Sequence, residues 1–195
     1  VLLRTSYVSV DPYLRGRMND AKSYIPPFEL KRPISSGIIA EVVESDHASL
    51  SKGDYVSGML EWKEYQKSDG QGLTKVDTTN VPQSAYLGVL GLTGLTAYLG
   101  LTEIGKPKKG ETLVVSGAAG AVGSVVGQIG IILGCRVVGI AGTDEKVEML
   151  KSDFGFDVAI NYNTTSNIAE ALAAACPDGV DVYFDNVGGA ISDAV

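Results

Sequence analysis

The chain has 195 residues, of which 45% are hydrophobic and 20% charged, and its formal net charge is −7 at pH 7. This acidic balance argues against nucleic acid or an anionic membrane surface as a main partner. No apolar run is long and uninterrupted enough to span a bilayer. Cys135 and Cys176 lack the spacing of metal ligands and are expected to be buried thiols. Nothing indicates an oxidising compartment, so we expect a cytoplasmic protein.

Residues 1–86 have the pattern of an all-β module. Short alternating or β-branched runs recur there, with turn signals such as Pro26-Pro27 and Asp69-Gly70 between them. The expected strands are Leu2–Val10, Ser36–Val43, Tyr55–Met59 and Gly72–Val76. A helix around Leu87–Leu101 is expected to join this module to the rest of the chain.

Residues 87–195 alternate between strand and helix patterns. Thr112–Ser116 is an apolar run typical of a buried parallel strand, and a glycine-rich turn and an apolar helical pattern through Leu133 follow it. The further elements expected are a strand at Cys135–Ala141, a helix from Asp144, a strand at Gly155–Ile160, a helix at Asn167–Ala175 and a strand at Val180–Asp185. This order predicts a right-handed, doubly wound parallel sheet. A complete fold of this kind has two halves, so we expect a fragment whose C-terminal strands are absent.

The glycine turn at residues 117–123 predicts a dinucleotide site. Strand, glycine turn and helix is the context in which such a motif is specific. Gly120 lets the backbone approach a pyrophosphate, and Gly123 lets the helix pack close to the strand. The helix N-terminus offers free N–H groups and a partial positive charge. Ala118, however, stands where G-x-G-x-x-G has its first glycine.

The end of the second strand favours NADP over NAD. An NAD-specific fold usually has an acidic residue about 20 residues after the glycine motif, where it holds the ribose 2′-OH. Gly142-Thr143 stands there instead, so a 2′-phosphate would not be repelled. Lys146 could reach it as a cation, although a solvated surface lysine is the alternative. The carboxyl ends of the strands place Ser116, Gly142, Tyr162 and Asn186 on one rim of the sheet.

An all-β module before a dinucleotide fold resembles the medium-chain dehydrogenase/reductase superfamily, in which that module is GroES-like. Four motifs look like its zinc-free alkenal/prostaglandin reductase branch, which includes leukotriene hydroxydehydrogenases and curcumin-reductase-like enzymes. The matching segments are Val8–Met18, Gly91–Tyr98, Ala118–Gln128 and Phe184–Gly189. The resemblance spans nearly all of the chain and implies that both ends of the protein lie beyond it.

The resemblance also implies roles for particular residues. It places Gly120, Ala121, Val122 and Gly123 at the pyrophosphate, Lys146 and Tyr162 at the 2′-phosphate, and Asn186 toward the nicotinamide half. Tyr13 either lines the substrate pocket or packs under the turn at Pro12, and Thr96 either faces the nicotinamide or is a buried helix threonine. Arg15 and Arg17 are expected to form structural ion pairs. The family's catalytic tyrosine lies outside this chain, so the catalytic residues here are unknown.

No metal site is expected. A catalytic zinc ion needs about three protein ligands. The all-β module has no cysteine, and its one histidine, His47, lies in a polar loop and is expected at the surface. Where alcohol dehydrogenases have a Gly-His-Glu motif, this chain has Ser35-Ser36-Gly37.

The resemblance therefore implies an NADPH-dependent reductase. The expected reaction is reduction of the C=C bond of an α,β-unsaturated aldehyde or ketone by hydride transfer to the β-carbon. The alternatives are a zinc-free NADPH quinone reductase and a non-catalytic NADP-binding protein. The expected partner is a small enone or enal substrate, and a homodimer is expected for the full-length protein.

Overall fold

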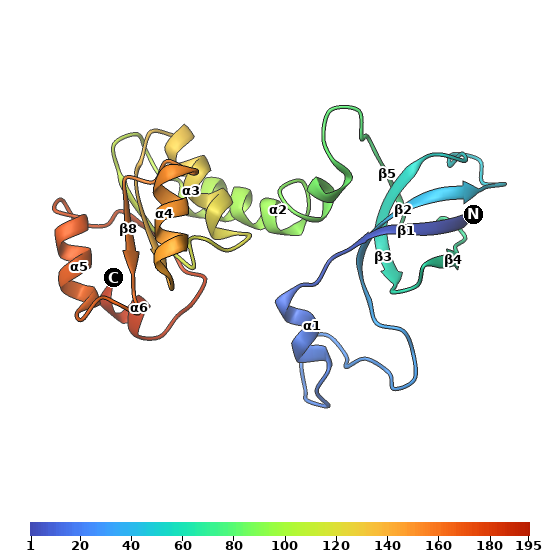
Figure 1. Cartoon of the computed structure of the whole chain (residues 1–195), viewed down its shortest axis with the longest axis horizontal. Helices are drawn as coiled ribbons and strands as arrows, with labels where there is room; N and C mark the ends of the chain where they lie inside the picture. The colour runs from blue at the N-terminus through green and yellow to red at the C-terminus, as the bar shows by residue number, and fades with distance from the viewer. The chain divides into compact units, whose positions relative to one another are not determined.

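The computed structural model describes residues 1–195 as two compact units, Val1–Gly91 and Leu92–Val195 (Figure 1). The division falls a few residues after the boundary expected at 86/87. Each unit has its own sheet and its own core.

The first unit is built on a five-stranded antiparallel sheet with the strand order β4-β1-β2-β3-β5. The strands are β1 (Leu2–Val8), β2 (Ser35–Glu44), β3 (Tyr55–Glu61), β4 (Tyr65–Lys67) and β5 (Thr74–Val76). β2 is the central strand, and its alternating burial sends Ile38, Ala40 and Val42 into the core with Leu3 and Val56. This is the GroES-like all-β module.

Two short helices complete the first unit. They are α1 (Pro12–Arg17) and the 3₁₀ helix η1 (Gln83–Leu87). The proline at the first position of α1 suits a helix start, because its missing N–H would have no partner there. The Trp62 indole N–H donates to Ser36 Oγ at 2.8 Å, and Ser36 Oγ donates to the Ser9 carbonyl at 2.8 Å. This buried link fixes the segment that leads from β1 into α1.

The second unit is built on a four-stranded parallel sheet with the order β8-β7-β6-β9. The strands are β6 (Thr112–Ser116), β7 (Arg136–Ala141), β8 (Val158–Asn161) and β9 (Val182–Phe184). β6 is buried along its whole length, as its apolar run predicts. The unit is a partial Rossmann-type fold. Its first strand, β6, has β7 and then β8 on one side and β9 on the other.

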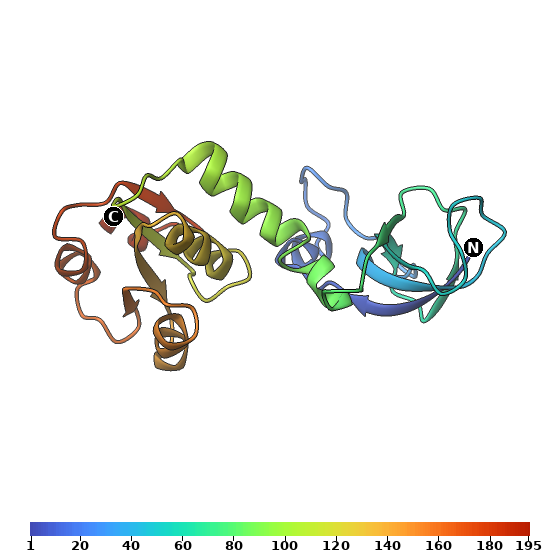
Figure 2. The ribbon, with the colours of Figure 1, turned by 90° about the horizontal axis from the view of Figure 1, so that it is seen from above.

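Helices cover both faces of this sheet (Figures 1 and 2). They are α2 (Leu92–Leu99), the π-helix η2 (Gly100–Gly105), α3 (Gly123–Ile132), α4 (Asp144–Ser152), α5 (Ile168–Ala175) and α6 (Ala190–Ala194). Alternate residues of β6 point to opposite faces: Leu113 packs with Val126 of α3 and Leu150 of α4, whereas Val114 packs with Leu172 of α5. The two cores therefore share one sheet.

Glycines on one side of α3 bring that helix close to the sheet. A Cβ on Gly130 would lie 2.5 Å from Leu113 Cδ2, and a Cβ on Gly127 would lie 1.9 Å from Phe156 Cζ. Contacts this short are not tolerated, so any side chain at either position would force the helix away or move its neighbour. The close packing expected of Gly123 thus extends over two further turns of the helix.

Several elements differ from those expected from the sequence. The helix expected at Leu87–Leu101 is interrupted at Gly91, between η1 and α2, where a Cβ would lie 2.5 Å from the Tyr86 carbonyl oxygen. Its second part continues without a break from α2 into the π-helix η2, which ends at Gly105. β4 was not expected, since a three-residue edge strand has too short a pattern to recognise. β8 begins at Val158 rather than at Gly155, because Gly155 adopts φ +73° and ends the preceding turn.

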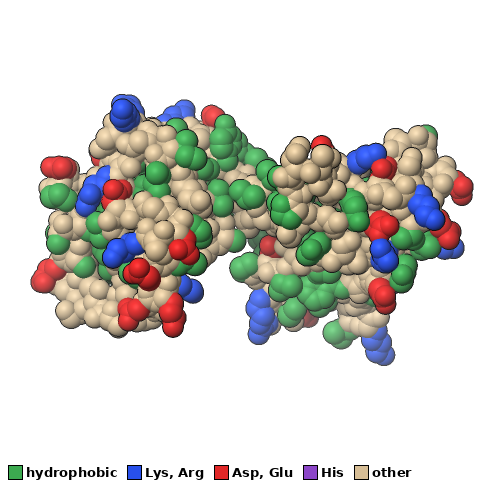
Figure 3. All heavy atoms as spheres, turned by 45° about the horizontal axis from the view of Figure 1, so that its top comes forward, with side chains coloured by type: hydrophobic (Ala, Val, Ile, Leu, Met, Phe, Trp, Pro, Cys, Tyr) green, Lys and Arg blue, Asp and Glu red, His purple; other side chains and the backbone are tan.

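None of the helices is long and apolar enough to cross a membrane. On the face drawn in Figure 3, Lys and Arg side chains are interspersed with Asp and Glu and form no continuous basic patch.

Candidate functional site

The glycine turn connects the carboxyl end of β6 to α3. Gly117 adopts φ +56°, a conformation that side chains disfavour, and Ala118 follows with no positive φ and no exposed surface. The tight turn is therefore made by Gly117, which explains why Ala118 can occupy the first glycine position of the motif. A Cβ on Gly123 would lie 2.5 Å from the Gly117 carbonyl oxygen, so the start of α3 packs against the turn itself.

The start of α3 presents unused backbone donors. The N–H groups of Ala121, Val122 and Gly123 donate no hydrogen bond within the chain, as expected for the first turn of a helix. No acidic residue occurs in that turn. Glycine at position 120 suits the tight turn, because a Cβ there would lie 3.1 Å from the Gly117 carbonyl oxygen. The turn can therefore accept an anion with direct backbone hydrogen bonds.

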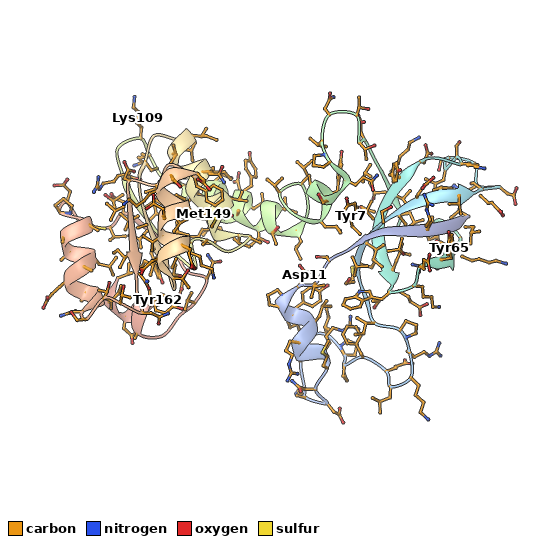
Figure 4. All side chains as sticks on the ribbon, viewed as in Figure 1. Tyr7, Asp11, Tyr65, Lys109, Met149 and Tyr162 are labelled. Carbon is orange, nitrogen blue, oxygen red and sulfur yellow. The ribbon has the colours of Figure 1, made fainter.

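The residues that follow β7 and β8 contact each other at the carboxyl edge of the same sheet. Tyr162, which follows β8, lies across Gly142, which follows β7: a Cβ on Gly142 would be 2.7 Å from the Tyr162 hydroxyl oxygen. Figure 4 places Tyr162 at the opposite end of the sheet from Lys109, which precedes β6. Asn163 Nδ2 donates to the Gly142 carbonyl at 2.7 Å and so holds the turn in place.

α4 begins directly after this turn. Thr143 caps the helix, with Oγ1 accepting from the Lys146 N–H at 3.3 Å. The Lys146 side chain is exposed and takes part in none of the four ion pairs. A cation without a fixed partner therefore stands in the first turn of α4, next to the glycine that replaces the usual acidic residue.

The ends of β6 and β9 are joined by hydrogen bonds. The Asn186 side chain donates from Nδ2 to the Ser116 carbonyl at 2.9 Å, and its backbone N–H donates to Ser116 Oγ at 2.8 Å. The structure thus brings together the two pairs expected on one rim, Ser116 with Asn186 and Gly142 with Tyr162. Asp185, which the sequence analysis did not single out, accepts the Ser116 hydroxyl at 2.9 Å. The feature of the sequence that could have identified Asp185 is its position at the end of a predicted strand, shortly before Gly188-Gly189.

Three further candidates lie in the first unit. Tyr13 lies on α1, is partly buried and forms no hydrogen bond within this unit; burial and the nearby Asp11 carboxylate raise the pKa of its hydroxyl. The ion pairs expected for Arg15 and Arg17 do not form. Arg15 hydrogen-bonds Asn19 at 3.3 Å, and Arg17 donates to the Pro26 carbonyl at 3.0 Å. The Arg17 guanidinium also stacks 3.9 Å from the centre of the Phe28 ring, since the loop after α1 folds back over the helix.

Thr96 of α2, in the second unit, is exposed rather than buried and donates to the Leu92 carbonyl at 2.7 Å. His47 is exposed, as expected, and Cys135 and Cys176 are buried free thiols. Burial is the main cause that raises the pKa of both thiols. No three His, Cys, Asp or Glu side chains gather where they could hold a metal ion.

A GroES-like module together with a Rossmann-type unit and its glycine turn defines an oxidoreductase architecture. Two family models match the chain, described as "N-terminal domain of oxidoreductase" over residues 1–76 and "Zinc-binding dehydrogenase" over residues 121–195. The chain belongs to the medium-chain dehydrogenase/reductase superfamily, in the group that contains curcumin, 2-alkenal and prostaglandin reductases.

Individual relatives match along the entire chain. The Bacillus subtilis protein YfmJ is 64% identical over 195 residues, which are 100% of this chain and 57% of YfmJ. The NADPH-dependent curcumin reductase of Escherichia coli is 50% identical over 100% of this chain and 56% of its own length. The solved structure of CurA from Vibrio vulnificus in complex with NADPH is 47% identical with a TM-score of 0.91, over 100% of this chain and 57% of CurA. The chain thus spans a little over half the length of these relatives.

Proposed function

We propose that the whole protein is an NADPH-dependent oxidoreductase that reduces the C=C bond of α,β-unsaturated aldehydes or ketones. The observation that carries the cofactor proposal is the set of unused N–H groups at Ala121, Val122 and Gly123, beside the glycine turn that follows β6. The substrate class is supported by relatives named 2-alkenal reductase and prostaglandin reductase.

The residues present fit a phosphorylated dinucleotide. In the proposed binding mode, the three N–H groups of α3 bind the pyrophosphate. Lys146 pairs with the 2′-phosphate, and the Tyr162 ring flanks it from the end of β8. The turn at Gly142 has no carboxylate that would repel a phosphate, which favours NADPH over NADH. Asn186 faces the nicotinamide half, and Tyr13 lines the substrate pocket.

When bound, NADPH supplies the hydride that the β-carbon of the substrate accepts. Negative charge then develops on the carbonyl oxygen, which hydrogen-bond donors can stabilise. We assign no residue of this chain to that role or to proton donation. The contribution that we propose for residues 1–195 is to bind and orient the cofactor and to line part of the pocket.

Calorimetric titration of this chain with NADPH and then NADH tests the cofactor proposal. Tighter binding of NADPH is expected, and equal affinities would contradict it. The full-length protein should then be assayed with an enone and with a quinone, following the consumption of NADPH. Faster turnover of the quinone would favour a quinone reductase, and binding without any oxidation of NADPH would indicate a non-catalytic protein.

The assembly and location of the full-length protein complete the proposal. We propose a homodimer in the cytoplasm. Light scattering on the purified full-length protein would measure the mass in solution, and a monomeric mass would contradict the dimer.

A further inference from the structure

Asp185 is the centre of a hydrogen-bond network at the carboxyl end of β9. Its carboxylate accepts five hydrogen bonds, of which four reach Oδ1 and one reaches Oδ2. The donors to Oδ1 are Ser116 Oγ (2.9 Å), the Tyr183 hydroxyl (2.9 Å), the Val187 N–H (2.9 Å) and the Gly188 N–H (2.8 Å), and the donor to Oδ2 is Ser192 Oγ (2.6 Å). These donors come from β6, from β9, from the loop that follows it and from α6.

Ser116 connects this network to the glycine turn. Its side chain is fully buried, donates to Asp185 and accepts the Asn186 N–H at 2.8 Å. The next residue, Gly117, packs directly on the loop after β9, where a Cβ would lie 3.3 Å from Asn186 Cβ and 3.4 Å from Val187 Cγ2. The glycine turn and the loop at residues 186–189 are therefore held against each other.

Beyond Asn186, which is bonded to Ser116, the loop at residues 186–189 is largely exposed and rich in glycine. Val187 is 56% exposed, and Gly188 and Gly189 adopt φ +77° and +64°. Glycines lose more conformational freedom on ordering than other residues, so such a loop needs strong contacts to keep one shape. Hydrogen bonds to a carboxylate are about twice as strong as those between neutral groups. Asp185 supplies such contacts to two consecutive N–H groups of the loop.

The sheet order shows which part of a dinucleotide this loop would meet. A dinucleotide lies across the carboxyl ends of the strands, with its pyrophosphate at the first glycine turn and its adenosine ribose at the end of the next strand in sequence. Those strands are β6 and β7, and β9 pairs with β6 on the side away from β7. The nicotinamide half therefore extends toward the end of β9.

We propose that Asp185 is a positioning residue that acts through Ser116 and holds the loop at residues 186–189 against the glycine turn, so that the nicotinamide half of the cofactor is fixed. This inference rests on the proposed function. It separates the site into two parts: binding of the adenosine 2′-phosphate half depends on the glycine turn at residues 117–123 and on the end of β7, whereas binding of the nicotinamide half depends on Asp185 and Ser116.

The test compares two ligands on the full-length protein: NADPH, and 2′-phospho-ADP-ribose, which lacks the nicotinamide. Asp185→Asn keeps the size of the side chain but removes its negative charge, so the hydrogen bonds to the loop lose their charge assistance. We expect the affinity for NADPH to fall about tenfold, which corresponds to about 1.4 kcal/mol. The affinity for 2′-phospho-ADP-ribose should stay within about twofold of the wild type. Ser116→Ala should show the same difference between the ligands.

Asp193→Asn is the matched control, because it makes the same chemical change at an exposed position on α6 and should alter neither affinity. Equal losses for both ligands in Asp185→Asn would mean general damage and would overturn the inference, as would unchanged binding of both. A wild-type protein that binds neither ligand would overturn the proposed function itself, and this inference with it.

Discussion

The Asn161 side-chain amide donates a 2.6 Å hydrogen bond from Nδ2 to the Asp144 carboxylate. Asn161 is the last residue of β8 and is 8% exposed, and Asp144 is the first residue of α4. The bond holds an acidic side chain in a fixed direction in the same helical turn as Lys146. The direction of the Asp144 carboxylate matters, because it stays negatively charged and would repel a 2′-phosphate if it turned toward that group.

Asn161→Ala should therefore weaken the binding of NADPH more than that of NADH. Two unit charges about 4 Å apart in water interact by about 1 kcal/mol, so the released Asp144 carboxylate should reduce NADPH affinity about fivefold. Calorimetry with both cofactors measures the difference. The double variant Asn161→Ala/Asp144→Asn removes the charge and should recover most of the NADPH affinity. Without that recovery, the charge of Asp144 would not be the cause.

Lys146→Ala should also weaken the binding of NADPH more than that of NADH, but for a different reason. It removes the cation that we propose to pair with the 2′-phosphate, and a charge-assisted contact of this kind contributes about 1.5–3 kcal/mol. NADPH affinity should fall by about tenfold or more, with little change for NADH. Lys151→Ala, in the last turn of the same helix, is the control. Equal losses for NADPH and NADH would contradict the assignment of Lys146.

Gly127→Ala should destabilise the second unit without altering the residues at the carboxyl ends of its strands. The added Cβ would lie 1.9 Å from Phe156 Cζ, so either α3 or the Phe156 ring must move. Overpacking of this kind costs about 1–3 kcal/mol, which urea unfolding can measure. Gly127→Ala combined with Phe156→Leu should regain part of the loss, because the smaller side chain leaves room for the methyl group. Gly16→Ala, where a Cβ would meet nothing within 4 Å, is the control.

The Asp185 network predicts a dependence of stability on pH. The hydrogen bond from Ser192 and those from the Val187 and Gly188 N–H groups hold the pKa of Asp185 well below its usual range. A carboxyl group whose pKa is lower in the folded state adds stability above its unfolded pKa of about 3.9, and that contribution is lost as the pH falls toward the folded value. The difference in unfolding free energy between wild type and Asp185→Asn should be constant from about pH 6 to 8 and shrink below about pH 4. If the difference in unfolding free energy grew as the pH fell, the lowered pKa of Asp185 would be contradicted.

Local patterns in the sequence were sufficient for the order of the parallel strands in the second unit, for the helices between them and for the position of the glycine turn. The buried run of β6 and the strand-turn-helix order around Gly120 both depend on residues close together in the chain. The sheet order β8-β7-β6-β9 agrees with the doubly wound arrangement expected from the alternation. The motifs in Val8–Met18 and Phe184–Gly189 also sufficed to recognise the family.

Only the tertiary structure decided which groups meet at the rim. Asp185 and Ser116 are 69 positions apart in sequence, and Asn161 and Asp144 are 17 apart, yet each pair forms a hydrogen bond. No local periodicity encodes such contacts, because they arise when parallel strands align their carboxyl ends and the side chains that follow each strand meet. Gly127 also looks like an ordinary helix residue from its neighbours in sequence, and only the packing of α3 against Phe156, which lies between α4 and β8, requires a glycine there.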